Sequence, residues 1–364
     1  MPFKHNSSRR DKFAKAKYRV RNWSEYNEAL RRRGDMTVWF SKDAVAGWSA
    51  SRSGKRGGQR KYSDLAIEAC LTLRVVFGLA LRQTQGFVRG LLGLMQVDIP
   101  VPDFSTLCRR AQSPKIASDI GPSNGPITLI VDSTGLRVHG GRDWMAEKHG
   151  LPRSRKTWRK LYIGLDPKSG YIVASCLTTE HIGDPGALPE LLADIEGPVR
   201  RFIGDGAYDG APTTETIRQA FGPDVELIIP PPKNAVTDDC AVRNAHIEMI
   251  AKQGRISWQK ATDYGPRSHG EAQIGRYKDV IGPALQSRKM ESQTTETQIA
   301  INALNRMTGL GRADYERVLE SRGKGAVRPE FDPCNTALLN ATSYRHARSD
   351  AFSLWADYTA GMVA

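Results

Sequence analysis

The sequence predicts an α/β protein, in which a mixed sheet flanked by helices follows an N-terminal helical region. Three observations predict this fold. Apolar residues recur at helical spacing from Ser63 to Gly78 and again over 82–95. The segments 160–165 and 171–177 are apolar, and the turn residues DPKSG between them favour a β-hairpin. Beyond the hairpin, helix-like and strand-like segments alternate, and this order favours a mixed sheet.

The positive charge of the chain is concentrated near its N-terminus. The formal net charge over 364 residues is +14, and residues 1–61 alone hold 17 basic against 5 acidic side chains. Such an arm attracts polyanions, so nucleic acid is the expected partner, with a solubilising tail or a ribosome-binding extension as the alternative. Within the arm we expect a helical region over Trp23–Trp48, capped by Asn22 or Ser24, and a linker over 51–61.

A helical region is expected over 62–112. Its second helix is predicted to place three apolar side chains on one face: Phe87, Leu91 and Leu94. After a break at two prolines, Asp103 or Ser105 can cap a third, short helix that carries Arg109 and Arg110. This order is typical of a helix-turn-helix-like DNA-binding region, and a plain helical bundle is the alternative.

The remaining chain is expected to form the sheet domain. Its expected elements are a strand at 128–131 that ends at Asp132, the hairpin, a helix at 184–195, a strand at 201–203, a helix at 213–221, a strand at 225–229 and helices at 268–281 and 294–308. The expected division is a basic arm and linker (1–61), the helical DNA-binding region (62–112), a linker (113–126), the catalytic core (127–310) with a polar helical insertion at about 233–262, and a C-terminal tail (311–364).

Two carboxylates follow apolar strand-like runs in the core. Asp132 comes after TLIV, and Asp205 comes after RFIG between two glycines. Neighbouring buried carboxylates repel each other unless a cation lies between them, and ligand sets made only of oxygen atoms select Mg²⁺ or Mn²⁺. The alternative for each is a turn or cap role, which we assign outright to three other aspartates of this region: Asp166, Asp184 and Asp209.

A third acid, Glu271, lies in a segment with several phosphate-binding residue types. Glu271 and Lys278 are seven residues apart and so share one face of a helix, which Tyr264 and Arg267 precede. Glu271 would then be a metal ligand, and Tyr264, Arg267 and Lys278 would surround it with phosphate-binding donors. The alternative is a capping box over Ser268–Glu271, in which the glutamate only closes the start of the helix.

The pattern Tyr-x2-Arg-x3-Glu-x6-Lys resembles the signature of the DDE transposases of bacterial insertion sequences, especially family 5 and its family 4 relatives. The motifs VDSTGL around Asp132 and GDGAYDG around Asp205 resemble the first two acidic motifs of that family, and LNRM (304–307) resembles its C-terminal helix. The likeness covers about 62–310 and implies a ribonuclease H-like catalytic core. The stretch before Tyr264 is too short for a large β-rich insertion.

This resemblance implies a function and roles for the residues of the motifs. Asp132, Asp205 and Glu271 would be catalytic and bind two Mg²⁺ or Mn²⁺ ions, while Tyr264, Arg267 and Lys278 would hold the backbone of transposon-end DNA. The enzyme would cleave DNA at the ends of its insertion sequence and join the 3′ ends to target DNA. The pairing of two ends implies at least a homodimer. A non-catalytic repressor and a nuclease without strand transfer are the alternatives.

Further basic residues precede the hairpin. Arg159 and Lys160, together with Trp158, are expected to track DNA, and a solvated charged loop is the alternative. His269 lies near Glu271, and a surface role is favoured over a ligand role. Five widely spaced cysteines without a C-x-x-C motif favour a reducing, cytoplasmic setting, and no apolar run approaches the length of a membrane span.

Overall fold

The computed structural model describes residues 17–52, 54, 56–112, 116, 125–138 and 157–318. The start of the basic arm (1–16), most of the linker 113–126 and the tail after 318 lie outside the described residues. The chain forms two compact units, one of Met1–Asp35 with Gly309–Ala364 and one of Met36–Thr308.

The first unit contains a small two-stranded sheet and a helix. β1 (Lys17–Val20) pairs antiparallel with β8 (Tyr315–Val318), and α2 spans Trp23–Arg32. Asn22 rather than Ser24 holds the N-cap position of α2, but its side chain makes no capping bond. Its amide instead donates to the Arg312 carbonyl at 2.8 Å, and its oxygen accepts from the Asp314 N–H at 2.8 Å.

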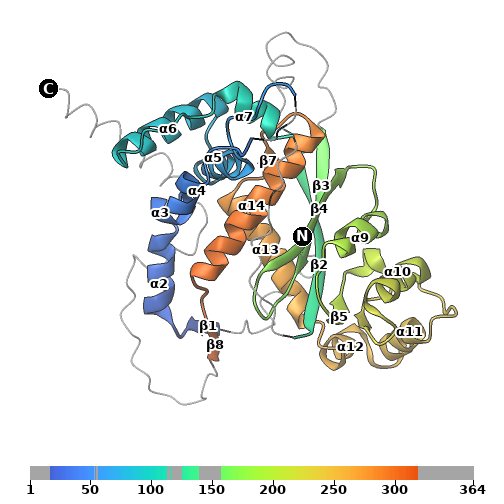
Figure 1. The fold of residues 1–364 in the computed structure, drawn as a ribbon. Coiled ribbons are helices and arrows are strands. Elements are labelled where there is room, and N and C mark those ends of the chain that lie inside the picture. Colours follow the sequence, from blue (N-terminus) through green and yellow to red (C-terminus); the bar gives the residue numbers. More distant parts are fainter. Residues whose placement is uncertain are drawn as a thin grey trace, which may run out of the picture. The chain divides into compact units, whose positions relative to one another are not determined.

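The second unit holds the sheet and the remaining helices (Figure 1). Its strands are β2 (Ile127–Val138), β3 (Trp158–Leu165), β4 (Ile172–Thr179), β5 (Val199–Ile203), β6 (Glu226–Ile228) and β7 (Ala284–Leu285). Its helices are α3 (Met36–Trp39), α4 (Lys42–Ala46), α5 (Asp64–Phe77), α6 (Leu81–Leu94), α7 (Phe104–Arg110), α9 (Asp184–Ala193), α10 (Ala211–Phe221), α11 (Ala241–Gln253), α12 (Arg255–Ala261), α13 (Ser268–Val280) and α14 (Met290–Leu310, whose last two residues belong to the first unit). Two short 3-10 helices are η2 (Gly206–Tyr208) and η3 (Gly265–Arg267).

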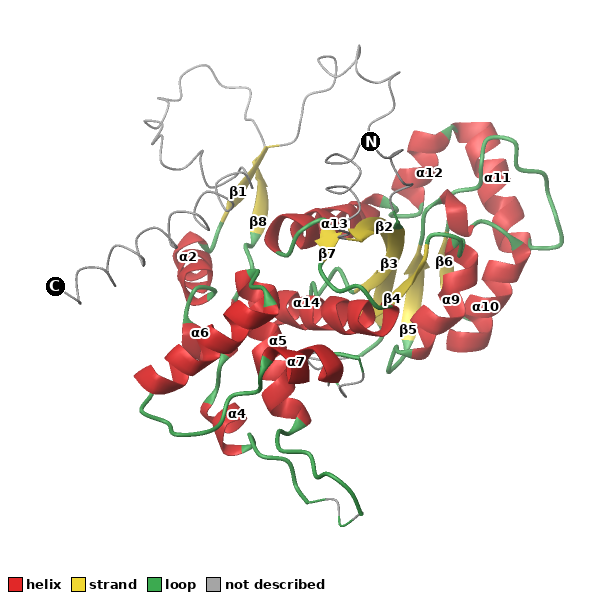
Figure 2. Cartoon of the chain, turned by 90° about the horizontal axis from the view of Figure 1, so that it is seen from above, coloured by secondary structure: helices red, strands yellow, loops and turns green. Residues whose placement is uncertain are grey.

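The sheet is mixed, as the sequence predicts. Its order is β4-β3-β2-β5-β6, with β7 paired to the far part of β2. β2 runs antiparallel to β3 but parallel to β5, and β6 is parallel to β5. Helices α9 and α10 cover one face through side chains such as Leu188 and Ile217, while α13 and α14 lie on the other face (Figures 1 and 2).

Helices α5 to α7 pack into the same hydrophobic cluster as α14. Leu73, Val88 and Leu107 are fully buried there with Leu304. Helix α5 has the predicted ends: the Ser63 hydroxyl accepts from the Ala66 N–H, and Gly78 closes the helix in the left-handed conformation at φ +65°.

Two details of α6 and α7 refine the prediction. The buried side of α6 is formed by Thr84, Val88 and Leu92, while Phe87 and Leu91 of the expected face are partly buried. Leu94, the third residue of that face, ends the helix and is 84% exposed. Asp103 rather than Ser105 caps α7, accepting from the N–H groups of residues 105 and 106.

The first strand of the core is longer than predicted. β2 continues to Val138, so Asp132 lies inside the strand and the expected strand end at Asp132 is wrong. Pairing with β3 persists along the whole extension and joins Leu136 to Arg159. Leu136 is fully buried, so the segment after Asp132 has its own place in the core.

The hairpin turn and the polar insertion form as expected. β3 and β4 are antiparallel, and the Asp166 carboxylate accepts from the N–H groups of Lys168 and Ser169, while Gly170 adopts φ +73°. The stretch 233–262 contains α11 and α12. In the part of the chain that the structure describes, no helix is both long enough and apolar enough to cross a membrane.

Candidate active site

The two aspartates meet because their strands are parallel neighbours. The register of β2 and β5 pairs Ile130 with Ile203, so Asp132 and Asp205 each lie two residues beyond this pair. Asp132 is buried, whereas the side chain of Asp205 is 39% exposed. The Asp205 carboxylate accepts from the Ala207 N–H at 2.9 Å and so opens the η2 turn.

Helix α13 brings the third acid to the same place. Gly270 lies against β2, where a Cβ atom would be 3.2 Å from the Asp132 Cβ and 3.2 Å from the Ile130 Cγ2. A Cβ atom here would be closer than in most Cβ contacts, so glycine lets the helix approach the strand without a shift. Glu271, the next residue, is thereby carried to the edge of the aspartate pair.

One guanidinium contacts all three acids. The Arg267 Nη2 is 3.4 Å from the Asp132 Oδ1 and 3.7 Å from the Asp205 Oδ2. The Arg267 Nη1 forms an ion pair with the Glu271 Oε1. The three predicted acids, from β2, the β5–η2 loop and α13, therefore converge on one point.

The capping box considered for α13 does not form. Arg267 takes the N-cap position and makes no side-chain cap, while the Ser268 hydroxyl donates to the Gly265 carbonyl. Glu271 faces Arg267 and the aspartates, because η3 leads directly into α13 and leaves no extended residue to cap.

Burial and charge oppose each other at this site. Burial raises the pKa of Asp132 above its ordinary value, the Arg267 guanidinium works against that rise, and the charges of Asp205 and Glu271 add to it. Burial by itself would lower the pKa of Arg267, but Asp132 and its neighbours outweigh burial and raise it. The arginine therefore stays charged and compensates acids that would otherwise repel one another.

The donor set fits a hard divalent cation. Three carboxylates supply the oxygen ligands that Mg²⁺ and Mn²⁺ prefer, and a positive charge already lies among them. In the described part of the chain, no three histidine, cysteine, aspartate or glutamate side chains are grouped closely enough to hold a metal ion as they stand.

Tyr208, in the turn that follows Asp205, has a buried hydroxyl without a hydrogen-bond partner. Its burial, and to a smaller extent the charges of Asp184 and Asp205, raise the pKa of this hydroxyl.

Tyr264 and Lys278 lie on either side of Glu271 in the chain. The Tyr264 ring packs on Trp258 with 5.2 Å between ring centroids, and burial raises the pKa of the Tyr264 hydroxyl to about 12. Lys278 is half-buried and lies two turns along α13 from Glu271. His269 is exposed, in keeping with the favoured surface role.

The other predicted DNA contacts differ in their availability. Arg109 is exposed and bonds to Ser105 and Thr106 of its own helix. Arg110 forms an ion pair with Asp64 and donates to the Tyr62 carbonyl at 3.0 Å.

Trp158, Arg159 and Lys160, expected before the hairpin or at its start, open β3 and are engaged within the fold. The Arg159 Nε donates to the Gln293 side chain at 2.8 Å, and the Lys160 Nζ lies 3.3 Å from the Asp184 carboxylate. Trp158 is 40% exposed and packs over Gly135. Three further basic residues that precede these in the sequence, Arg153, Arg155 and Lys156, lie outside the described residues.

Two aspartates have roles that the sequence reading missed. Asp184 is not a cap, since Gly183 holds that position; its carboxylate accepts from the Tyr162 hydroxyl at 3.0 Å. Asp209 is not simply a turn residue, because it forms a buried ion pair with Arg243. The motif GDGAYDG carries a sequence signal for a role of Asp209, because an aromatic residue and this second aspartate follow Asp205 at short spacing.

A mixed sheet between helices with three acids gathered beside its central strands defines a ribonuclease H-like core. Residues 31–141 match one family model and residues 123–317 match another, both described as "Transposase DDE domain". The second match alone spans more than half of the chain, so this chain belongs to the family of transposases with a DDE domain. Family membership makes DNA the substrate class and metal-dependent DNA transposition the chemistry of the family.

Proposed function

We propose that this chain cleaves DNA at the ends of its own insertion sequence and joins the freed 3′ ends to target DNA, as members of insertion-sequence family 5 do. The observation that carries the proposal is the convergence of Asp132, Asp205 and Glu271 on Arg267. The three acids would hold Mg²⁺ or Mn²⁺, two ions per site, and bound ions would activate the attacking oxygen and stabilise the leaving one.

The residues around the acids bind and orient the DNA backbone. Arg267 presents a planar guanidinium that can bind a phosphate through two donors. Tyr264 forms one wall of the site, and Lys278 adds a second positive charge on the helix that carries Glu271. Since a phosphate competes with the carboxylates for Arg267, DNA binding loosens the contacts that hold the three acids to the arginine.

Regions outside the core supply affinity and sequence reading. The basic arm over 1–61 adds salt-dependent attraction, and the helical region over 62–112 presents the exposed Arg109 to the duplex. Arg110, Arg159 and Lys160 would contact DNA only after exchanging their present partners for phosphate. Joining two ends requires two active sites, so the working form is at least a homodimer.

The test uses labelled end DNA, a plasmid target and Mg²⁺. The unmodified chain should yield strand-joined product, whereas Asp132→Asn, Asp205→Asn and Glu271→Gln should each abolish cleavage and still bind the DNA. Asp279→Asn is a matched control, because it removes an exposed carboxylate from the helix that carries Glu271. Full cleavage by the three variants would refute the assignment. Nicking without joining would indicate a nuclease, and binding without nicking would indicate a repressor.

A further inference from the structure

We infer that Arg243 is a positioning residue for Asp205: through a buried ion pair with Asp209, it holds the loop that presents the second acid. The inference rests on the proposed function, because positioning matters only if Asp205 takes part in the reaction. The polar insertion that carries Arg243 would then be a structural support of the active site.

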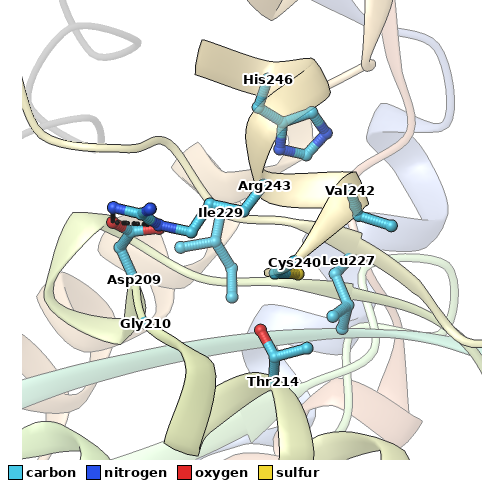
Figure 3. Close-up of a pocket in the computed structure, with 9 residues that line it drawn as sticks. All are labelled: Asp209, Gly210, Thr214, Leu227, Ile229, Cys240, Val242, Arg243 and His246. Atoms are coloured by element: carbon cyan, nitrogen blue, oxygen red, sulfur yellow. Dashed lines mark hydrogen bonds and ion pairs between the residues drawn. The ribbon is translucent and has the colours of Figure 1, made fainter. Parts of the chain in front are cut away.

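The ion pair is close and well enclosed. The Arg243 Nε lies 2.9 and 3.0 Å from the two Asp209 oxygens, and Nη2 lies 2.9 Å from Oδ2 (Figure 3). The side chains of Arg243 and Asp209 are only 14% and 7% exposed. Removing Arg243 would leave the buried Asp209 carboxylate without its ion-pair partner, whereas Arg243 itself also pairs with Asp238 at 2.9 Å.

The loop between Asp205 and Asp209 is short and held at several points. Asp205 accepts from Ala207, Tyr208 packs edge-on against Phe202 at 6.2 Å, and Asp209 is held by Arg243. A Cβ atom on Gly206 would be 3.1 Å from the Pro230 carbonyl oxygen, so the loop has little room on that side. A displacement of Asp209 is therefore transmitted through one turn of η2 to Asp205.

Helix α11 is held by specific polar and aromatic contacts as well as by partial burial. None of its thirteen residues is fully buried, while Met249 and Ile250 are partly buried against the hydrophobic core. Arg243 holds it to the Asp205 loop, and His246 packs edge-on against Trp258 at 5.5 Å, which in turn packs on Tyr264. The helix thus joins the segment carrying the second acid to the segment that opens the Tyr264 signature.

The space beside the ion pair does not suggest a ligand site. The cavity there measures ≈ 20 Å³ and is lined by residues that include Thr214, Cys240 and His246 (Figure 3). That volume is about enough for one water molecule. The close packing favours a supporting role for Arg243 over the binding of a small molecule.

The experiment weakens the ion pair and follows the loop, the metal and the reaction separately. The variants are Arg243→Lys, which keeps the charge, and Arg243→Gln, which removes it. Lys252→Gln is the matched control, because it removes a cation of the same helix whose ion pair is with the exposed Glu248. The measurements on the full chain are amide hydrogen exchange over 204–209, Mn²⁺ binding by calorimetry, and kcat and KM for cleavage of end DNA.

In Arg243→Gln we expect faster exchange over 204–209, and about 10- to 100-fold losses in Mn²⁺ affinity and in kcat with little change in KM. Arg243→Lys should lose less than Arg243→Gln, because it keeps the positive charge. Unchanged exchange, or faster exchange with normal Mn²⁺ binding and kcat, would overturn the inference and leave the proposed function intact. If the unmodified chain neither cleaves nor binds Mn²⁺, the proposed function fails first and the inference falls with it.

Discussion

Arg267 and Asp132 are 135 residues apart in the sequence, yet the Nη2 of the arginine lies 3.4 Å from the Oδ1 of the aspartate. The aspartate belongs to the longest strand of the sheet, and the arginine ends the short helix that leads into α13. The same guanidinium also reaches Asp205 and Glu271, so a single guanidinium pairs with all three acids and offsets part of their charge. Arginine and metal ions are therefore expected to compete for these oxygens.

The first prediction concerns this competition. Arg267→Gln should bind Mn²⁺ roughly tenfold more tightly than the unmodified chain in the absence of DNA, because a competing positive charge is removed. The same variant should cleave end DNA poorly, since a phosphate ligand is lost. Calorimetric titration with Mn²⁺ checks the affinity, and Lys260→Gln, which removes an exposed cation from α12, is the control. Equal or weaker Mn²⁺ binding by Arg267→Gln would show that the arginine does not compete.

The second prediction concerns the close approach of α13 to β2. Gly270→Ala places a methyl group 3.2 Å from both the Asp132 Cβ and the Ile130 Cγ2, so the helix must shift by a few tenths of an ångström. We expect a loss of about 1–3 kcal/mol in unfolding free energy and at least about tenfold in cleavage rate.

Gly275→Ala on the same helix is the matched control. Nothing lies within 4 Å of a Cβ atom at Gly275, so alanine should stabilise the helix by about 0.5–1 kcal/mol and leave cleavage unchanged. Denaturant unfolding and the cleavage assay measure both variants. If Gly270→Ala behaves like Gly275→Ala, the close approach is not needed for the site.

The third prediction concerns Asn305, in the LNRM segment of α14. Its fully buried side chain accepts from the Ile172 N–H and donates to the Ile172 carbonyl, both at 2.9 Å. Asn305→Leu leaves two buried backbone groups of the edge strand without partners, which should cost about 2–5 kcal/mol of unfolding free energy. Arg306→Gln, at a more exposed position, should cost less than about 1 kcal/mol. Urea unfolding of the two variants compares them, and equal losses would contradict the prediction.

The fourth prediction concerns pH and His246. Burial lowers the pKa of His246 below its ordinary value of 6.5. As pH falls, the unfolded chain therefore takes up a proton on this histidine before the folded chain does, so stability is lost from about pH 6.5 downward through the folded pKa. His246→Phe keeps an aromatic ring against Trp258 and removes this loss.

The measurement is the melting temperature of both proteins between about pH 8 and pH 5. The difference in melting temperature should move in favour of His246→Phe as pH falls, and all other titrating groups cancel in the comparison. A difference that stays constant with pH would show that His246 titrates alike in the folded and unfolded chains.

Local features of the fold could be predicted because their causes lie within a few residues. Ser63 and Gly78 bound α5 because a hydroxyl cap and a left-handed glycine act on the adjacent turn. The hairpin forms because Asp166 and Gly170 satisfy the geometry of the turn between its strands. The length of β2 could not be predicted in this way, because its second half is stabilised by pairing with β3.

The sequence by itself determined which residues could do the chemistry: the spacing of Tyr264, Arg267, Glu271 and Lys278 and the two aspartate motifs belong to the chain alone. Only the tertiary structure decided that Glu271 faces the aspartates instead of capping its helix, and that Asp209 pairs with Arg243. The physical reason is the sequence separation over which each interaction acts. Caps and turns depend on neighbours in the chain, whereas ion pairs between distant segments depend on strand register and on how closely helices pack against the sheet.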